Sequence, residues 1–490
     1  MDETRCAPSQ STDKNPPSDS LDAQSWATVQ FGTADLGDSR RDRRLVRIAA
    51  GIVANASTSL LKQFPEWSEL MATYRFLSND AIAPGDILAP HLALVRQQAG
   101  AHPVVLCLED DTEMDYTHRS GISGLGQIGN GEGRGLLQHS ALAALPDGRL
   151  LGILDIAWHA VQPVPENETR RQQQARWNIS DVWHEAVQHI GSWQGPGMLV
   201  HVGDRHADLF RHLACCLLQG HQFVVRAMHD RYIDESTTRL WEKVTARPAL
   251  GMITVRVGTQ RNGLSRVTRE GREAVLTIRS APVRIPPPSN DPRTADWAEV
   301  PAWGIHLVEE NPPEEVRRKG EAVEWMLLSS LPAEDLASAL MVIGYYTRRW
   351  LIEEWHRCYK EGCGIEASQL DQAKDVQRLG AIVGVVAVRL LQMRDLADEK
   401  HPQANDPKAL QQLVPPLHIQ LVARLCRADA ATLTPRQFFL AVAKRGGYLG
   451  RRRDPRPGWI VLWRGWHDIL QMVCGAELLL KLQKNSAGCV

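Results

Sequence analysis

The sequence predicts an α/β fold: a mixed sheet covered by helices, with a β-rich insertion and with helical regions on both flanks. Three observations predict it. Short apolar runs alternate with helical stretches over 101–227, short strand candidates broken by Gly and Pro fill 229–330, and helical spacing dominates elsewhere. With 490 residues, 43% of them hydrophobic and 23% charged, the chain has enough apolar material for about three globular domains.

The N-terminal part of the chain predicts a polar tail and a small helical domain. Residues 1–22 are rich in Ser, Asp and Pro and predict a disordered tail. The domain then covers 23–100. Its strongest helix, over 38–55, has apolar residues on one face and arginines crowded into its first turns, and a second helix is expected over 67–77.

The centre of the predicted sheet lies between 101 and 227. A meander of strands is expected at 104–108, 136–145 and 150–158, because a Pro-Asp-Gly turn separates the last two. Helix, strand, helix and strand then follow at 181–193, 198–203, 208–219 and 222–227.

Two long helices and a helical C-terminal region complete the expected order. The helices are predicted over 335–360 and 375–400, and the second closes a central domain of residues 101–400 that includes the insertion. Residues 401–490 form the C-terminal region, which a basic loop interrupts at 451–453.

Composition excludes several classes of protein. With 56 basic and 57 acidic residues the formal charge is -1, so a globally basic nucleic-acid binder is excluded, but local basic patches are not. The nine cysteines form no C-x-x-C pair, so their spacing does not predict a zinc site, and free thiols fit a reducing cytosol. No apolar signal region and no run of about 18 apolar residues occur, so we expect a cytoplasmic protein.

Two of the apolar strand candidates end in a carboxylate, at Asp110 and at Asp204. Asp often ends a strand as a turn or cap residue, and for either aspartate alone that interpretation is favoured. The helix expected over 335–360 supplies a third acid, Glu353. Three carboxylates without a P-loop motif favour nuclease-type chemistry, in which two Mg²⁺ ions stabilise the attacking and leaving oxygens of a phosphoryl displacement.

A set of polar and charged side chains follows one face of that helix. Tyr346, Arg349, Glu353 and Lys360 stand at i, i+3, i+7 and i+14, which puts them within about 60° of one another over about 21 Å. These residue types do not make a core stripe. A solvated helix face with i,i+4 ion pairs gives the same pattern, and without other information it is the favoured interpretation.

The same residues carry a resemblance to a known family. Residues 346–360, YTRRWLIEEWHRCYK, resemble the Y-x2-R-x3-E-x6-K signature of insertion-sequence-family-four transposases, the bacterial DDE cut-and-paste enzymes of the transposon-five type. The residue types and all the spacings agree. The resemblance covers residues 25–480, nearly the whole chain.

Further segments resemble other parts of that family. Residues 108–112 resemble the strand end with the first catalytic Asp, residues 202–208 resemble the second, and residues 37–45 resemble the end-recognition helix. Residues 223–226 and 325–329 also match family segments.

Two features depart from the family. Its first site usually has one Asp followed by Thr, whereas this chain has Asp110-Asp111-Thr112, so Asp111 is the alternative first ligand. Asp110 is preferred because it follows Glu109 as in the family. The polar N-terminal tail has no counterpart there.

The resemblance implies a ribonuclease-H-like core, with the insertion between the second Asp and the Glu, and a C-terminal region that pairs two subunits. It implies that Asp110, Asp204 and Glu353 are catalytic and hold two Mg²⁺ ions, which Mn²⁺ can replace. The implied partners are transposon-end DNA and target DNA, in a bacterial cytoplasm near the nucleoid. The implied reaction is nicking by water, hairpin formation by the freed 3′-hydroxyl, hairpin opening, and strand transfer into target DNA.

The resemblance also implies DNA contacts near the carboxylates. Trp325 is the expected stacking surface for an extruded base, and Tyr346, Arg349 and Arg226 are expected to hold adjacent phosphates. Lys360 is expected to contact a phosphate rather than a metal ion. Without the resemblance, Trp325 is equally well interpreted as a core strand residue.

A cluster of arginines is expected to recognise the transposon end, at Arg40, Arg41 and Arg44. As a bare run of charge it would more often be a solvated helix face. The three arginines of 451–453 are a second candidate contact on charge alone.

Two other classes of function stay open. A DNA-binding regulator without catalysis would need no metal-binding carboxylates, so the acidic residues argue against it. A stand-alone nuclease with the same core would need neither an end-binding helix nor the Trp and Tyr positions.

Overall fold

The computed structural model describes residues 22–55, 59–165, 167–169, 172–173, 176–193, 195–234, 238–261, 267–451, 454 and 456–487. All but the last residue of the expected tail 1–22 lie outside these residues, and so do Arg452 and Arg453 of the basic loop. The chain divides into two compact units. Residues 1–91, 361–368 and 378–490 form the first unit, and residues 92–360 and 369–377 form the second.

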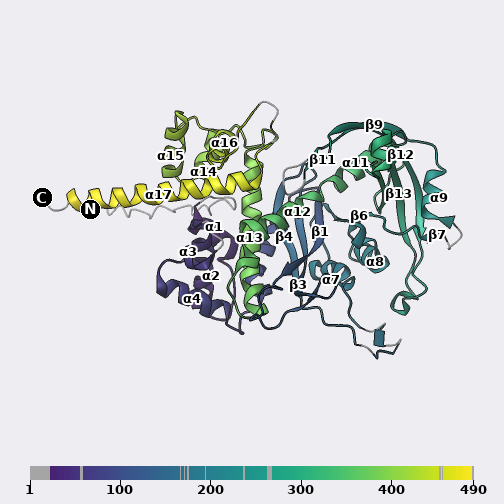
Figure 1. Cartoon of the computed structure of the whole chain (residues 1–490), viewed down its shortest axis with the longest axis horizontal. Helices are drawn as coiled ribbons and strands as arrows, with labels where there is room; N and C mark the ends of the chain where they lie inside the picture. The colour runs from purple at the N-terminus through teal and green to yellow at the C-terminus, as the bar shows by residue number, and fades with distance from the viewer. Residues whose placement is uncertain are drawn as a thin grey trace, which may run out of the picture. The chain divides into compact units, whose positions relative to one another are not determined.

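A ten-stranded mixed sheet is the centre of the second unit (Figure 1). Its order is β2-β3-β1-β5-β6-β14-β13-β12-β9, and β4 also pairs with β3. The strands are β1 Val104–Asp115, β2 Gly126–Ile128, β3 Gly133–Ala144, β4 Leu150–His159, β5 Met198–Gly203, β6 Gln222–Arg226, β9 Gly251–Val257, β12 Arg272–Ile285, β13 Val300–Val308 and β14 Glu324–Ser329. The pairs β1–β5 and β5–β6 are parallel and the others are antiparallel, so the prediction of a mixed α/β sheet is confirmed.

Helices and short ladders accompany this sheet. The helices are α7 Asp181–Ile190, α8 Phe210–Leu218, α9 Leu240–Thr245, α10 Glu314–Arg318, α11 Leu336–Thr347 and α12 Trp350–Arg357. Two short ladders pair β7 Tyr232–Ile233 with β8 Thr238–Arg239 and β10 Gln260–Arg261 with β11 Val267–Arg269. Trp183 of α7 and Leu213 of α8 are buried with Phe223 and Met326 of the sheet in one apolar cluster, so these helices cover one face of the strands.

Strands β9, β12, β13 and β14 of residues 229–330 extend the central sheet. β14, near the end of this segment, pairs antiparallel with β6 through Leu327 and Arg226. β13, β12 and β9 then add to β14 in turn. Trp325 therefore lies on a strand next to the strand of Arg226.

The expected strand end at Leu108 is wrong, because β1 continues to Asp115. β1 pairs with β3 from Leu106 to Asp115, so the ladder continues past the apolar run. Backbone hydrogen bonds form this ladder whatever the polarity of the side chains. The end of the apolar run therefore lies before the end of the strand. Asp110 therefore lies inside a strand.

The expected single helix over 335–360 is also wrong. α11 ends at Thr347 and α12 begins at Trp350. Between them the backbone bonds join residues three apart, with Arg349 N–H donating to Tyr346 O at 3.1 Å, which is the tighter 3₁₀ pattern. A π turn, Cys358–Gly362, follows α12 and contains Lys360.

Among the residues that the structure describes, the first unit consists of helices joined by turns and loops. Its helices are α1 Ala23–Phe31, α2 Ser39–Ala54, α3 Leu60–Gln63, α4 Trp67–Leu77, α14 Pro407–Leu413, α15 Pro416–Cys426, α16 Pro435–Arg445 and α17 Trp459–Ala487. The expected helices over 38–55 and 67–77 are confirmed as α2 and α4, and Asp38 caps α2 by accepting from Arg40 N–H at 2.9 Å.

Two long helices run from one unit into the other, α5 Pro84–Ala99 and α13 Ala373–Leu396. α13 is the one helix among the described residues that is long and apolar enough to cross a membrane. In its most apolar stretch of 18 residues, 89% of the residues are buried in the protein. Such burial is typical of the core helix of a soluble protein.

Candidate active site

Residues from neighbouring strands of the sheet share one face. β1 and β5 pair in parallel up to Leu108 and Val202, and two residues further along each strand stand Asp110 and Asp204. Gly203 pairs with Val225, so Arg226 lies beside Asp204 with its side chain on the same face. Arg226 pairs with Leu327 of β14, so the Leu327 side chain is also on that face. Side chains alternate across a strand, so Trp325 shares the face of Leu327. The sheet thus presents Asp110, Asp204, Arg226 and Trp325 on one side.

Arg349 joins two of the predicted carboxylates. α12 packs against β1, and the Arg349 guanidinium at its start lies 3.3 Å from Asp110 Oδ2 through Nη1 and 2.6 Å from Glu353 Oε1 through Nη2. The Arg349 and Asp110 side chains are 9% and 13% exposed, whereas Glu353 is 35% exposed. One buried cation therefore partly neutralises a buried and a half-buried carboxylate.

Asp204 stands directly after β5 and caps a single 3₁₀ turn, Arg205–Ala207. Its Oδ1 accepts the backbone N–H of His206 at 2.7 Å. The cap holds the carboxylate at the end of the strand, and its charge acts on the neighbouring Asp110.

The pKa of Asp110 reflects its burial and the neighbouring carboxylates. Burial raises the pKa of Asp110 to about 7, Arg349 opposes the rise, and the carboxylates of Asp204, Asp111 and Glu353 add to it. Carboxylate oxygens are the donor set of a hard divalent cation such as Mg²⁺ or Mn²⁺. Asp110, Asp204 and Glu353 could therefore hold such an ion.

Asp111 occupies a different position from Asp110. Its backbone N–H donates to Asp110 Oδ1 at 3.1 Å, and its Oδ1 lies 3.6 Å from His206 Nδ1. By alternation its side chain leaves β1 on the other face, next to the edge of the site. Arg349 connects Glu353 to Asp110 and not to Asp111. The contact with His206 was not predicted, because no spacing in the sequence links these residues.

Aromatic and basic groups adjoin the carboxylates. Trp325 is half-buried and its ring meets that of Tyr346 edge to face, with centroids 5.1 Å apart. Burial raises the pKa of the Tyr346 phenol, while the charges of Arg349 and Arg226 act in the opposite direction. Arg226 donates to the backbone oxygen of Glu324 at 3.0 Å. Trp325, Tyr346, Arg226 and Arg349 thus lie in one region beside the carboxylates.

Lys360 belongs to the same region in spite of the broken helix. Its Nζ donates to the backbone oxygen of Glu113, three residues beyond Asp110 on β1. The π turn after α12 carries it there.

The arginines of α2 lie in the other unit and already have partners. Arg44 and Arg47 each lie 2.5 Å from Glu69 of α4. Arg41 donates to Leu36 O at 3.1 Å, and Arg40, whose side chain is 83% exposed, pairs with the cap residue Asp38. DNA phosphates would compete with these acceptors.

Residues 23–82 match the family model described as transposase DNA-binding. The match covers α1 to α4 and therefore includes the arginines of α2. It supports a transposase, or at the least a DNA-binding role, with DNA as the partner.

We predict that the buried charge of Asp110 makes the metal-free protein less stable as pH rises. The carboxyl titrates near its usual value of 3.8 when unfolded and at about 7 when folded. Well below pH 3.8 it is neutral in both states, whereas above pH 7 its buried charge costs the folded state up to about 4 kcal/mol, at about 1.4 kcal/mol per pKa unit. In EDTA, the stability of Asp110→Asn relative to wild type should therefore increase between pH 4 and pH 8. Denaturant unfolding across that range measures it, and a difference that does not change with pH would contradict the assignment.

Proposed function

We propose that the chain is a DNA transposase of the cut-and-paste type, with a ribonuclease-H-like core in its second unit. One observation carries the proposal: Arg349 pairs with both Asp110 and Glu353, and the charge of Asp204 acts on Asp110, in a chain whose residues 23–82 match a transposase DNA-binding model. The Y-x2-R-x3-E-x6-K resemblance supports the cut-and-paste class.

Asp110, Asp204 and Glu353 would hold two Mg²⁺ ions, which Mn²⁺ can replace. The donor set fits, because it consists of carboxylate oxygens and because like charge raises the pKa of Asp110. Such ions stabilise negative charge on the attacking and leaving oxygens of an in-line displacement.

Arg349 would have two roles. It balances Asp110 and Glu353. With bound cations to balance those carboxylates instead, the guanidinium would be available to a DNA phosphate, for which its planar set of donors is suited. Tyr346 and Arg226, whose charges and that of Arg349 act on one another, would hold the neighbouring phosphates.

The proposed reaction is a series of displacements at phosphorus. Water attacks the phosphodiester at the transposon end and releases a 3′-hydroxyl. That hydroxyl attacks a phosphodiester of the opposite strand, displaces the 3′-oxygen of the flanking DNA and forms a hairpin. Water then attacks the hairpin phosphodiester and releases the 3′-hydroxyl again. The 3′-hydroxyl finally attacks a phosphodiester of target DNA and displaces its 3′-oxygen.

Trp325 would hold a base that the hairpin cannot keep stacked. A tight hairpin bends the backbone, so a base must leave the helix, and an aromatic face compensates for the lost stacking. The half-buried ring is fixed by Tyr346, and Lys360, by Glu113, would contact a phosphate further along the strand.

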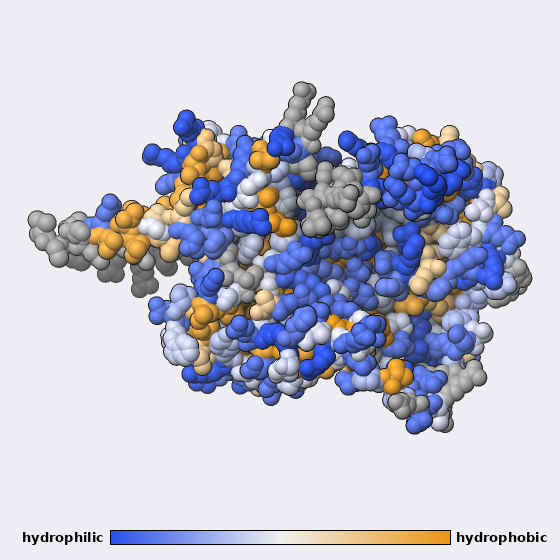
Figure 2. Space-filling view, in the orientation of Figure 1, coloured by the Kyte–Doolittle hydropathy of each residue, from blue (hydrophilic) through white to orange (hydrophobic). Residues whose placement is uncertain are grey.

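A second subunit would pair through the C-terminal region. Figure 2 shows apolar residues on the part of α17 that leads to the C-terminus. Leu478, Leu479 and Leu480 there are 59%, 62% and 48% exposed. Neighbouring exposed leucines on a helix are typical of a helix-pairing surface.

Glu353→Gln should abolish Mg²⁺-dependent cleavage of a duplex that carries the element's own terminal sequence. We expect a loss of at least about a hundredfold, because the variant loses a charge that stabilises the transition state. Denaturing gels with and without Mg²⁺ measure nicks and hairpins, and Glu354→Gln on the same helix is the matched control. Specific binding without cleavage by wild type in Mg²⁺ or Mn²⁺ would favour a regulator, and cleavage without joining to target would favour a nuclease.

Trp325→Ala should slow hairpin formation more than first nicking. Loss of one base stack of about 1–3 kcal/mol corresponds to a loss of about 5- to 100-fold in the hairpin step alone. Single-turnover gels resolve the two steps. Trp303→Ala, which removes an indole from the adjacent strand β13, is the control. Equal losses in both steps would assign Trp325 to packing.

Glu69→Gln should strengthen binding of the transposon end by about three- to tenfold at low salt, because it frees Arg44 and Arg47 and removes a charge that repels phosphate. Fluorescence anisotropy over a salt series measures it. The control is Glu66→Gln at the start of α4, since the exposed Glu66 makes no ion pair with any residue that the structure describes. An equal effect of the two substitutions would mean that these arginines do not contact DNA.

A further inference from the structure

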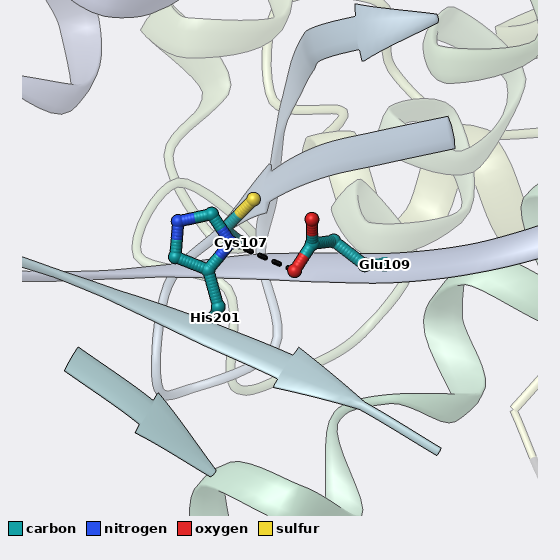
Figure 3. A group of neighbouring side chains, drawn as sticks. All are labelled: Cys107, Glu109 and His201. Carbon is teal, nitrogen blue, oxygen red and sulfur yellow. Dashed lines mark hydrogen bonds and ion pairs between the residues drawn. The ribbon is translucent and has the colours of Figure 1, made fainter. Parts of the chain in front are cut away.

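A second group of ionisable side chains lies under the candidate active site, on the opposite face of the same strands. Cys107 and Glu109 of β1, His139 of β3, His201 of β5 and His212 of α8 are all fully buried, at 0% exposure. They take no part in the proposed reaction. Figure 3 shows Cys107, Glu109 and His201 directed toward one another.

Strand pairing brings this group together. Cys107 and Glu109 are two residues apart on β1, so their side chains share a face. Cys107 is paired with His201 on β5, which adds the imidazole to that face. One possible ligand atom from each of these three residues lies within 4.8 Å of the other two.

Two of the histidines converge on one oxygen of Glu109. Glu109 Oε2 lies 2.7 Å from His201 Nδ1 and 3.7 Å from His212 Nε2. The other oxygen, Oε1, lies 3.7 Å from His139 Nε2. Buried atoms without a hydrogen-bond partner among the described residues include Glu109 Oε1, His212 Nε2 and both ring nitrogens of His139. Each buried polar atom left in this state costs about 1–3 kcal/mol.

His212 is oriented as a metal ligand would be. Its Nδ1 lies 3.2 Å from the backbone oxygen of Trp183, and a carbonyl oxygen only accepts, so Nδ1 carries the hydrogen. A neutral ring with its hydrogen on Nδ1 has a lone pair on Nε2. That lone pair points at the Glu109 carboxylate, and two acceptors face each other. A histidine whose Nδ1 donates to a backbone carbonyl is in the usual orientation of a metal ligand.

The spacing also fits a tetrahedral ion. With metal–nitrogen and metal–oxygen bonds of about 2.0–2.1 Å, neighbouring ligand atoms around a zinc ion lie about 3.3–3.4 Å apart. The separation of 3.7 Å between Glu109 Oε2 and His212 Nε2 is slightly wider, and that of 2.7 Å to His201 Nδ1 is narrower. The ligand atoms of Cys107, Glu109 and His201 lie within 4.8 Å of one another, so the side chains would close around the ion as it binds.

We propose that Cys107, Glu109, His201 and His212 bind a structural Zn²⁺ ion behind the catalytic strands. Sulfur and imidazole donors with a single carboxylate select zinc over Mg²⁺, which prefers oxygen. Binding releases the thiol proton of Cys107, and the charges then balance, since a thiolate and a carboxylate offset the two charges of the ion. His139, next to Glu109 Oε1, orients the carboxylate from outside.

Such an ion would tie together the elements that carry the carboxylates of the active site. It would link β1, β5 and α8, and so fix the strands of Asp110 and Asp204 against each other. The cluster is fully buried, so zinc would enter during folding and leave slowly. The proposal does not depend on the proposed function, because it rests on other residues and on the other face of the sheet.

Metal content is the direct test. Full-length protein produced in zinc-supplemented medium and dialysed against EDTA should retain about one Zn²⁺ per chain by inductively coupled plasma mass spectrometry. Cys107→Ser and His212→Gln should each lose most of it. Cys215→Ser, a buried thiol on α8, and Asp204→Asn should keep it. Circular dichroism checks that each variant is folded.

Wild-type protein can be tested where a variant does not fold. Chain refolded with Co²⁺ in place of Zn²⁺ should show the absorption of a thiolate-to-cobalt charge transfer, and refolding with Zn²⁺ should raise the thermal midpoint above that in EDTA. A wild-type protein with neither zinc nor cobalt absorption would overturn the proposal. The proposal would also be overturned if Asp204→Asn lost the zinc and Cys107→Ser kept it, because the ion would then be bound by the carboxylates of the candidate active site. Neither result bears on DNA cleavage, so the two proposals fail separately.

Discussion

The parallel pairing of β1 with β5 is the constraint on which both groups of buried charge depend. Side chains alternate across a strand, so this one register puts Asp110 level with Asp204 on one face and Cys107 level with His201 on the other. A slip of one residue would exchange the two faces and place Glu109 among the active-site acids. The long ladder of β1 with β3, from Leu106 to Asp115, resists such a slip.

Both faces of these strands meet the same electrostatic problem with different chemistry. On one face, carboxylates crowd around Arg349, and burial together with like charge raises the pKa of Asp110. On the other, the single acid Glu109 is surrounded by imidazoles, and although burial opposes it, His201 holds the pKa of Glu109 below its usual range. An oxygen set suits a hard, exchangeable ion, whereas a mixed set of sulfur, nitrogen and oxygen suits a retained one. Strand β1 thus contributes side chains to both groups and holds them on opposite faces of the sheet.

The DNA-binding part is under a similar restraint. Glu69 holds Arg44 and Arg47, and Asp38 holds Arg40, so these arginines would reach phosphate only by exchanging one acceptor for another. Pairs near the surface contribute little stability, so the exchange would cost little. A formal charge of -1 for the chain is thus compatible with DNA binding through a few local cations whose partners are replaceable.

The sequence by itself determined the local elements and carried a resemblance in the helical segment. The apolar spacing of α2 and α4 predicted their bounds closely, and the Tyr, Arg, Glu and Lys spacing of residues 346–360 resembles the signature of a family of phosphoryl-transfer enzymes. Periodicity and spacing are properties of neighbouring residues, so they can be read from one chain.

Only the tertiary structure decided how those elements meet. Asp110 lies inside β1 because β3 pairs along its whole length, and the 3₁₀ step at Arg348 and Arg349 separates α11 from α12. The cluster of Glu109 with His201 and His212 left no spacing signal. Its members come from β1, β5 and α8, and only the pairing of residues far apart in the chain, together with helix packing, brings them within bonding distance.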